Sequence, residues 1–299
     1  MRPARSLLIY TIVVFAGGAL IAPWLYWLVQ SLAPNSHLAQ TPFHRFLDRS
    51  LLGVALLGIW PLLRSLGITW PECGLVIVSS SRRWKLLTQG FALGFGSLAT
   101  AAIIAIAAHA RTLNTDLFLS TNKILAKFAA TAATAAVVAI LEEILFRGAI
   151  FGALRKAWNW RIALLVSSMI YAIVHFLAKA DLPGPVTWTS GLRLLPLKLT
   201  GFGDLPTLIP GFFNLTLAGV LLGLAYYRTG NLYFSIGLHA GWIFWLKSYG
   251  VLTSPITSSN TWLWGTDKLI DGWLALAVLA VALFILLRLL PDKSRHTVP

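Results

Sequence analysis

Eight apolar segments in succession constrain this chain more than any other feature of its sequence. They cover residues 6–32, 46–66, 86–108, 124–146, 162–177, 208–227, 232–249 and 269–290. A run of about 20 apolar residues is long enough to cross the hydrocarbon core of a bilayer as an α-helix. Because lipid offers no hydrogen-bond partners, the backbone of each segment must satisfy itself, as a helix does. The sequence therefore predicts an all-α polytopic membrane protein with about eight transmembrane helices.

The composition and charge of the chain agree with this class. Of 299 residues, 57% are apolar and 11% are charged, against about 45–50% and about 25% in soluble domains. The formal net charge is +14, from 24 Lys and Arg against 10 Asp and Glu. These charges are scattered between apolar segments and form no basic face for nucleic acid, so the lipid bilayer is the expected partner. The single Cys73 excludes an intramolecular disulfide and a Cys-rich metal site.

The distribution of Lys and Arg predicts the orientation in the membrane. The loops and tail on the side of the N-terminus hold more of these residues (Arg82, Arg83, Lys85, Arg155, Lys156, Arg161, Arg228, Lys293, Arg295) than the loops on the other side (Arg111, Lys179, Arg193, Lys198). Cytoplasmic loops carry such an excess, so we expect both termini in the cytoplasm. No repeat or long linker divides the chain, which predicts a single membrane domain over residues 1–299.

Ionisable residues inside the apolar segments are candidates for function, because each costs about 2.5–3.5 kcal/mol on membrane insertion scales. Glu142 and Glu143 lie near the end of segment 124–146, followed by Arg147. On a helix Glu143 and Arg147 share one face, four residues apart with the acid first, which is the favourable order for an ion pair. Glu142 points about 100° away from Glu143. The spacing predicts a structural carboxylate at Glu143 and a carboxylate available for chemistry at Glu142.

Two histidines lie inside other apolar segments, His175 near the end of segment 162–177 and His239 within segment 232–249. A lone histidine in a membrane helix often only packs against its neighbours. Two of them on separate helices, together with an unpaired glutamate on a third, can converge in a water-filled cavity. There an imidazole orients water or donates a hydrogen bond to an oxyanion.

Three short motifs contain these candidate residues. Leu141–Gly148 holds the pattern EExxxR, Tyr171–His175 resembles FxxxH with Tyr in place of Phe, and residues 230–242 resemble a third motif, HxxxN, around its histidine. Their order and spacing over residues 124–250 resemble the CPBP intramembrane proteases, the CAAX-prenyl-protease and bacteriocin-processing (Abi) group. Any one motif is weakly specific, whereas three in order on successive segments are strongly so.

The resemblance implies hydrolysis of a peptide bond inside the membrane. Glu142, helped by His175, would activate water, His239 would stabilise the tetrahedral oxyanion, and the pair of Glu143 and Arg147 would hold the helix end. The substrate would be a protein or peptide at the membrane. We expect a multi-pass protein of the bacterial inner (cell) membrane, whose protease core covers residues 124–250.

The chain departs from the family's pattern at one position. The Asn of the third motif would stand four residues after His239, where this chain has Ile243. An Asn there would donate an amide N–H to the oxyanion, and loss of one such donor typically costs about 10²–10³ in rate. Asn214, in segment 208–227, is the candidate for oxyanion support in its place. The alternative is that Asn214 only forms hydrogen bonds to a neighbouring helix.

Other mechanisms and functions stay open at this stage. The resemblance implies no cofactor, but two His and one Glu are also the ligand set of several zinc hydrolases, although HExxH is absent here. A catalytically silent membrane scaffold or immunity protein is compatible with Ile243. A secondary transporter also places His and Glu within its helices, but usually in two related halves, and no second half is visible here. Retention of both Glu and both His favours the protease.

Overall fold

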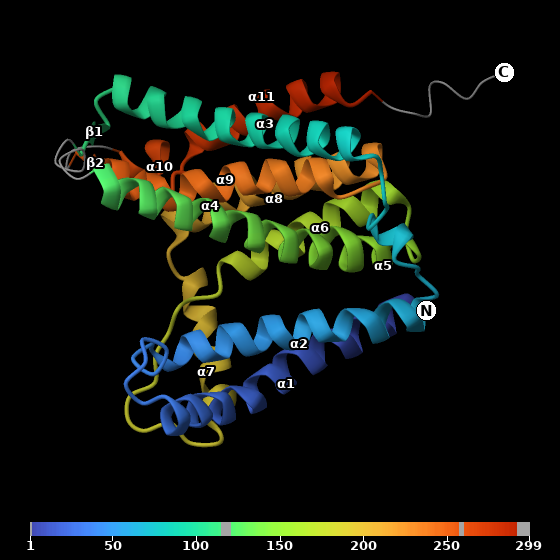
Figure 1. Ribbon diagram of the computed structural model, residues 1–299, viewed down its shortest axis with the longest axis vertical. Helices are drawn as coiled ribbons and strands as arrows, with labels where there is room; N and C mark the ends of the chain where they lie inside the picture. Colours follow the sequence, from blue (N-terminus) through green and yellow to red (C-terminus); the bar gives the residue numbers. More distant parts are fainter. Residues whose placement is uncertain (1, 115–120, 257–259, 292–299) are drawn as a thin grey trace.

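The computed structural model describes residues 2–114, 121–256 and 260–291, and over these residues each predicted segment coincides with a long helix (Figure 1). These helices are α1 (Arg2–Leu32), α2 (Phe43–Leu66), α3 (Ser80–Ala107), α4 (Thr121–Glu143), α6 (Trp160–His175), α8 (Leu205–Thr229), α9 (Tyr233–Leu252) and α11 (Trp273–Leu289). The prediction of an all-α polytopic membrane protein is confirmed. Lys293 and Arg295, which contributed to the predicted orientation, lie outside the described residues.

Several short elements, none of which the sequence predicted, lie between the long helices. A π-helical segment, Ile144–Phe151, continues α4 into α5 (Gly152–Arg155). The remaining short elements are α7 (Ser190–Lys198), α10 (Thr261–Trp264), the 3₁₀ turns Pro71–Cys73 and Leu199–Phe202, and the antiparallel strands β1 (Arg111–Leu113) and β2 (Thr253–Pro255).

Length and apolar composition qualify five of the described helices for crossing a membrane: α1, α2, α3, α4 with its continuation, and α8. The shorter apolar helices α6 and α11 contain 16 and 17 residues. At 1.5 Å per residue, 16 residues rise about 24 Å, less than the hydrocarbon core of about 30 Å. Helix α9 belongs to neither group. It lies in the middle of the bundle, where α3, α4 and α8 pack against it (Figure 1).

Glycines bring α3 and α9 into direct backbone contact, which fixes the helix that carries His239. A Cβ atom on Gly90 would lie 2.2 Å from the carbonyl oxygen of Phe234, and one on Gly237 would lie 2.1 Å from that of Leu87. Small residues allow such close approach between membrane helices, where packing replaces the hydrophobic driving force. A larger side chain at either glycine would push α9 away from α3 and displace His239.

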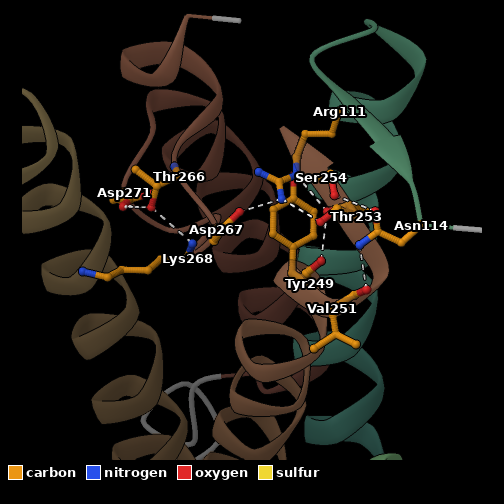
Figure 2. A network of polar contacts seen from close by, with 10 residues as sticks. All are labelled: Arg111, Asn114, Tyr249, Val251, Thr253, Ser254, Thr266, Asp267, Lys268 and Asp271. Atoms are coloured by element: carbon orange, nitrogen blue, oxygen red, sulfur yellow. Dashed lines mark hydrogen bonds and ion pairs between the residues drawn. The ribbon is translucent and has the colours of Figure 1, made fainter. Parts of the chain in front are cut away.

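A polar network joins the ends of α3 and α9 to the segment before α11, at the end of the bundle opposite the N-terminus (Figures 1 and 2). Arg111 is 3% exposed. Its guanidinium donates to the Thr253 hydroxyl (2.8 Å), the Thr253 carbonyl (3.0 Å) and Asp267 Oδ1 (2.7 Å), and it lies 4.4 Å from the centre of the Tyr249 ring. The hydroxyl of Tyr249 has no hydrogen-bond partner among the described residues. This network holds the C-terminal end of α9 through the side chain of Arg111, not through the hydroxyl of Tyr249.

Candidate active site

Glu142 and Glu143 are the last two residues of α4, where the α-helix changes into the π-helical segment 144–151. The sequence predicted an ordinary helix as far as Phe146. π-helical turns are rare and occur frequently at functional sites. The predicted ion pair is nevertheless present, because a guanidinium nitrogen of Arg147 lies 3.0 Å from Glu143 Oε1. Both side chains are buried, with exposures of 3% for Arg147 and 0% for Glu143.

Glu143 has a second partner that the sequence did not predict. Nδ1 of His239 lies 2.9 Å from the same carboxylate oxygen that Arg147 contacts. Because the paired carboxylate accepts, Nδ1 of His239 carries the proton and donates it. Glu143 therefore joins α9 to the turn after α4, in addition to its ion pair.

Glu142 faces two imidazole rings. Its Oε2 lies 3.7 Å from Nε2 of His239 and 3.9 Å from Nε2 of His175. These separations are longer than hydrogen bonds, and Oε2 has no hydrogen-bond partner among the described residues. Polar atoms separated by more than about 3.5 Å are commonly bridged by a water molecule. The structure thus brings together the predicted residues of α4, α6 and α9, as the sequence suggested.

The hydrogen bonds of the two histidines determine which ring nitrogen each one presents to Glu142. Nδ1 of His175 lies 2.7 Å from the carbonyl oxygen of Tyr171 and donates to it. A neutral His175 therefore presents an unprotonated Nε2 towards Glu142, whereas Nδ1 of His239 donates to Glu143. A water molecule between Glu142 and His175 would donate one O–H to each of these two acceptors. The arrangement is suited to removing a proton from that water.

The site has an accessible half and an enclosed half. The side chains of Glu142 and His175 are 24% and 32% exposed, whereas that of His239 is only 5% exposed. Glu143 and Arg147 are buried behind His239. A substrate would therefore approach from the side of Glu142 and His175.

Tyr171 is a site residue that the sequence analysis did not select. Its hydroxyl lies 3.2 Å from Nε2 of His239. The signal was present in the sequence, because Tyr171 stands where the FxxxH motif has Phe, and the two side chains differ by this hydroxyl.

Asn214, the candidate for oxyanion support, and Ile243, which stands in place of the family's Asn, have other surroundings. Nδ2 of Asn214 donates to the carbonyl oxygens of Ile270 (2.7 Å) and Gly272 (2.8 Å). Both amide protons are therefore used in joining α8 to the segment before α11, which favours the structural alternative for this residue. Ile243 is buried in an apolar cluster with Ala135 and Ala139 of α4.

The Asn214→Ala variant should lose stability and keep its turnover. The substitution leaves two buried carbonyl groups without their donor, and each such group costs about 1–3 kcal/mol. We expect a lower midpoint of thermal unfolding in detergent, with unchanged activity per folded molecule. A fall in turnover without a loss of stability would return Asn214 to the oxyanion site.

The spacing of the ionisable side chains also bears on a metal. The part of the chain that the structure describes contains no group of three or more His, Cys, Asp or Glu residues arranged to hold a metal ion. Glu142, His175 and His239 supply a suitable donor set but converge loosely, as the distances of 3.7 and 3.9 Å show. We therefore derive no catalytic step through zinc.

One comparison with known proteins gives a match. Residues 123–245 match the model of the Rce1-like family, type II CAAX prenyl endopeptidases. No curated protein and no solved structure was found to match. The matched range contains all three motifs, so the resemblance drawn from the motifs is confirmed. Residues 123–245 of this helical membrane protein are thus similar to the Rce1-like family of type II CAAX prenyl endopeptidases.

Proposed function

We propose that this protein is an intramembrane endopeptidase that hydrolyses a peptide bond of a membrane-associated protein or peptide, with Glu142 as the general base. The observation that carries the proposal is the position of Glu142. Its Oε2 has no hydrogen-bond partner among the described residues and faces Nε2 of both His175 and His239. This arrangement lies inside the part of the chain that matches a peptidase family.

In this mechanism Glu142 removes a proton from a water molecule held between its carboxylate and His175. The water oxygen forms a bond to the carbonyl carbon of the substrate, and the carbonyl electron pair moves to the oxygen. When this tetrahedral intermediate collapses, the C–N bond breaks and Glu142 returns the proton to the leaving amine. A positioned base of this kind contributes about 10²–10⁴ in rate.

His239 acts on the oxyanion as a cation in this proposal. The charges of Arg147 and Glu143 cancel, which leaves the negative charge of Glu142 facing His239. A protonated His239 would balance that charge, and Nδ1–H donating to Glu143 would support it. A positive charge that is already in place where negative charge develops stabilises such an intermediate. It thereby lowers the barrier to the reaction.

Access from the lipid is supported by an apolar groove of about 540 Å³ between α1, α6 and α7. Its lining includes Ile173, Val174 and Leu177, which lie on either side of His175 in the sequence. An apolar groove along the end of the helix that carries His175 suits a substrate segment that arrives from the bilayer. We further propose the cytoplasmic orientation of both termini, which follows from the distribution of Lys and Arg.

The test is cleavage of membrane-anchored peptides by the purified protein in proteoliposomes. The panel would contain peptides with and without a prenylated cysteine near the C-terminus, and mass spectrometry would locate new termini. We expect at least one peptide to be cleaved at a defined bond. Ile243 favours the alternative of a silent scaffold, and failure to cleave any peptide in the panel would support that alternative.

Cleavage should survive zinc chelators, because the proposed mechanism uses a carboxylate and two imidazoles without a metal. The measurement is the turnover of protein treated with a chelator and then freed of it, together with its metal content. Stoichiometric zinc in active protein, with activity lost on its removal and restored on its return, would overturn this prediction.

A further inference from the structure

The hydroxyl of Tyr171 is a polar group in the enclosed half of the site that the mechanism above does not use. We propose that Tyr171 is a second oxyanion donor, which acts beside His239 and provides the hydrogen bond that a side-chain amide at position 243 would otherwise give. This inference rests on the proposed peptidase function and adds a catalytic residue to it.

Packing holds the Tyr171 ring in one place. The residue is 3% exposed. The edge of its ring meets Phe146, with ring centres 5.1 Å apart, and the Arg147 guanidinium lies 4.5 Å from its centre. The His175 ring lies 4.4 Å away on a tilted plane. A hydroxyl on a ring confined by these neighbours is held in position before the reaction, which is what an oxyanion donor requires.

The hydroxyl also has the right neighbour, because it lies 3.2 Å from Nε2 of His239, the ring nitrogen that faces Glu142. When His239 is neutral, the Tyr171 O–H donates to Nε2. When His239 is protonated, Nε2–H donates to the tyrosine oxygen, and the tyrosine O–H is free to donate a hydrogen bond to another acceptor. In that form the O–H points towards the oxyanion. The charged imidazole, which donates to the tyrosine oxygen, makes the O–H a stronger hydrogen-bond donor.

The other donor side chains around the site each have a partner elsewhere. The Arg147 guanidinium donates to Glu143 and, at 3.5 Å, to the carbonyl oxygen of Gly219. Nδ1 of His175 donates to backbone, and both amide protons of Asn214 are used elsewhere. The apolar cluster around Ile243 supplies no donor. Tyr171 is thus the neutral donor that the described residues place beside His239.

The step transfers no proton to the oxyanion. The water proton moves to Glu142, the new C–O bond forms, and the carbonyl electron pair becomes the negative charge that Tyr171 O–H contacts through a hydrogen bond. His239 keeps its proton throughout the cycle, and when the intermediate collapses the Tyr171 hydroxyl no longer faces a charged oxygen. Its contribution is therefore confined to the tetrahedral state, and its loss should lower kcat with little change in KM.

The experiment compares Tyr171→Phe with wild-type protein and with Tyr249→Phe in the same proteoliposome assay. Tyr249 is a matched control, because it is also buried, carries Arg111 at 4.4 Å from its ring, and has a hydroxyl without a partner among the described residues. We expect kcat of Tyr171→Phe to fall by about 10²–10³, with KM and the unfolding midpoint within error of wild type. The Tyr249→Phe variant should be unchanged in all three.

Two further measurements separate a contact with the oxyanion from a purely structural role. A peptide with a phosphonate at the scissile position mimics the anionic tetrahedral state, and its affinity for Tyr171→Phe should fall by the same factor as kcat, while an uncleaved peptide binds equally. Adding Ile243→Asn to Tyr171→Phe should restore part of kcat. Wild-type turnover in Tyr171→Phe would overturn the inference and leave the peptidase standing. Absence of cleavage by wild type, or equal cleavage by Glu142→Gln, would overturn both.

Discussion

The Glu142→Gln variant should insert and fold normally but lose cleavage by about 10²–10⁴. Glutamine has the size of glutamate and cannot accept the water proton, so the loss should appear in kcat. Because Glu142 Oε2 makes no hydrogen bond to a described residue, little stability depends on this carboxylate. The measurement is turnover per folded molecule in proteoliposomes, with the unfolding midpoint determined in detergent.

A matched control for this variant is Glu72→Gln. Glu72 lies in the turn before α3, where the backbone N–H and hydroxyl of Thr69, and then Lys156, lower its pKa to about 2. It is therefore ionised at neutral pH, half exposed and remote in sequence from the three motifs. Its substitution removes a charged carboxylate and should leave turnover unchanged. Substantial turnover by well-folded Glu142→Gln protein would remove Glu142 from the role of base.

Removal of either Glu143 or Arg147 should destabilise the protein by about 3–5 kcal/mol, because it leaves the other charge buried without the opposite charge of its ion pair. The two side chains are 0% and 3% exposed, so water can do little to stabilise the charge that remains. The double variant Glu143→Gln/Arg147→Met removes both charges and should cost much less than the sum of the single variants. Unfolding in detergent measures this coupling.

The exposed pair of Glu72 and Lys156 is the control for this double-mutant cycle. Its side chains are 48% and 41% exposed, and ion pairs in such surroundings contribute little because water screens them. The corresponding cycle should show weak coupling or none. Purely additive effects for Glu143 and Arg147 would contradict the structural pairing. Glu143→Gln should in addition reduce activity, since His239 loses its charged partner.

Those features of the structure that a single physical rule governs followed from the sequence. Eight apolar segments became eight helices because a backbone in lipid must satisfy its own hydrogen bonds. The pairing of Glu143 with Arg147 followed from helical spacing and persists at the start of the π-helical turn. The convergence of Glu142, His175 and His239 followed from the cost of placing ionisable groups within a membrane.

Individual hydrogen bonds and strand pairs between distant parts of the chain did not follow from the sequence. The bond from His239 to Glu143 needs the rotation of α9 against α4, which glycine contacts with α3 help to set. For the same reason, the sequence leaves the role of Asn214 open, because its carbonyl partners lie on a distant segment. The strand pair between β1 and β2 joins residues more than a hundred positions apart, and no local pattern indicates it.

The central claim, that Glu142 activates water for peptide hydrolysis, is tested most directly by a single turnover in water labelled with a heavy oxygen isotope. Excess wild-type protein in proteoliposomes would cleave a membrane-anchored peptide once, and mass spectrometry would follow the label in the peptide product and in the protein segment that contains Glu142. The mechanism predicts the label in the new carboxyl group of the product and none in Glu142. Label in the Glu142 carboxylate, or no cleavage of any membrane-anchored peptide, would contradict it.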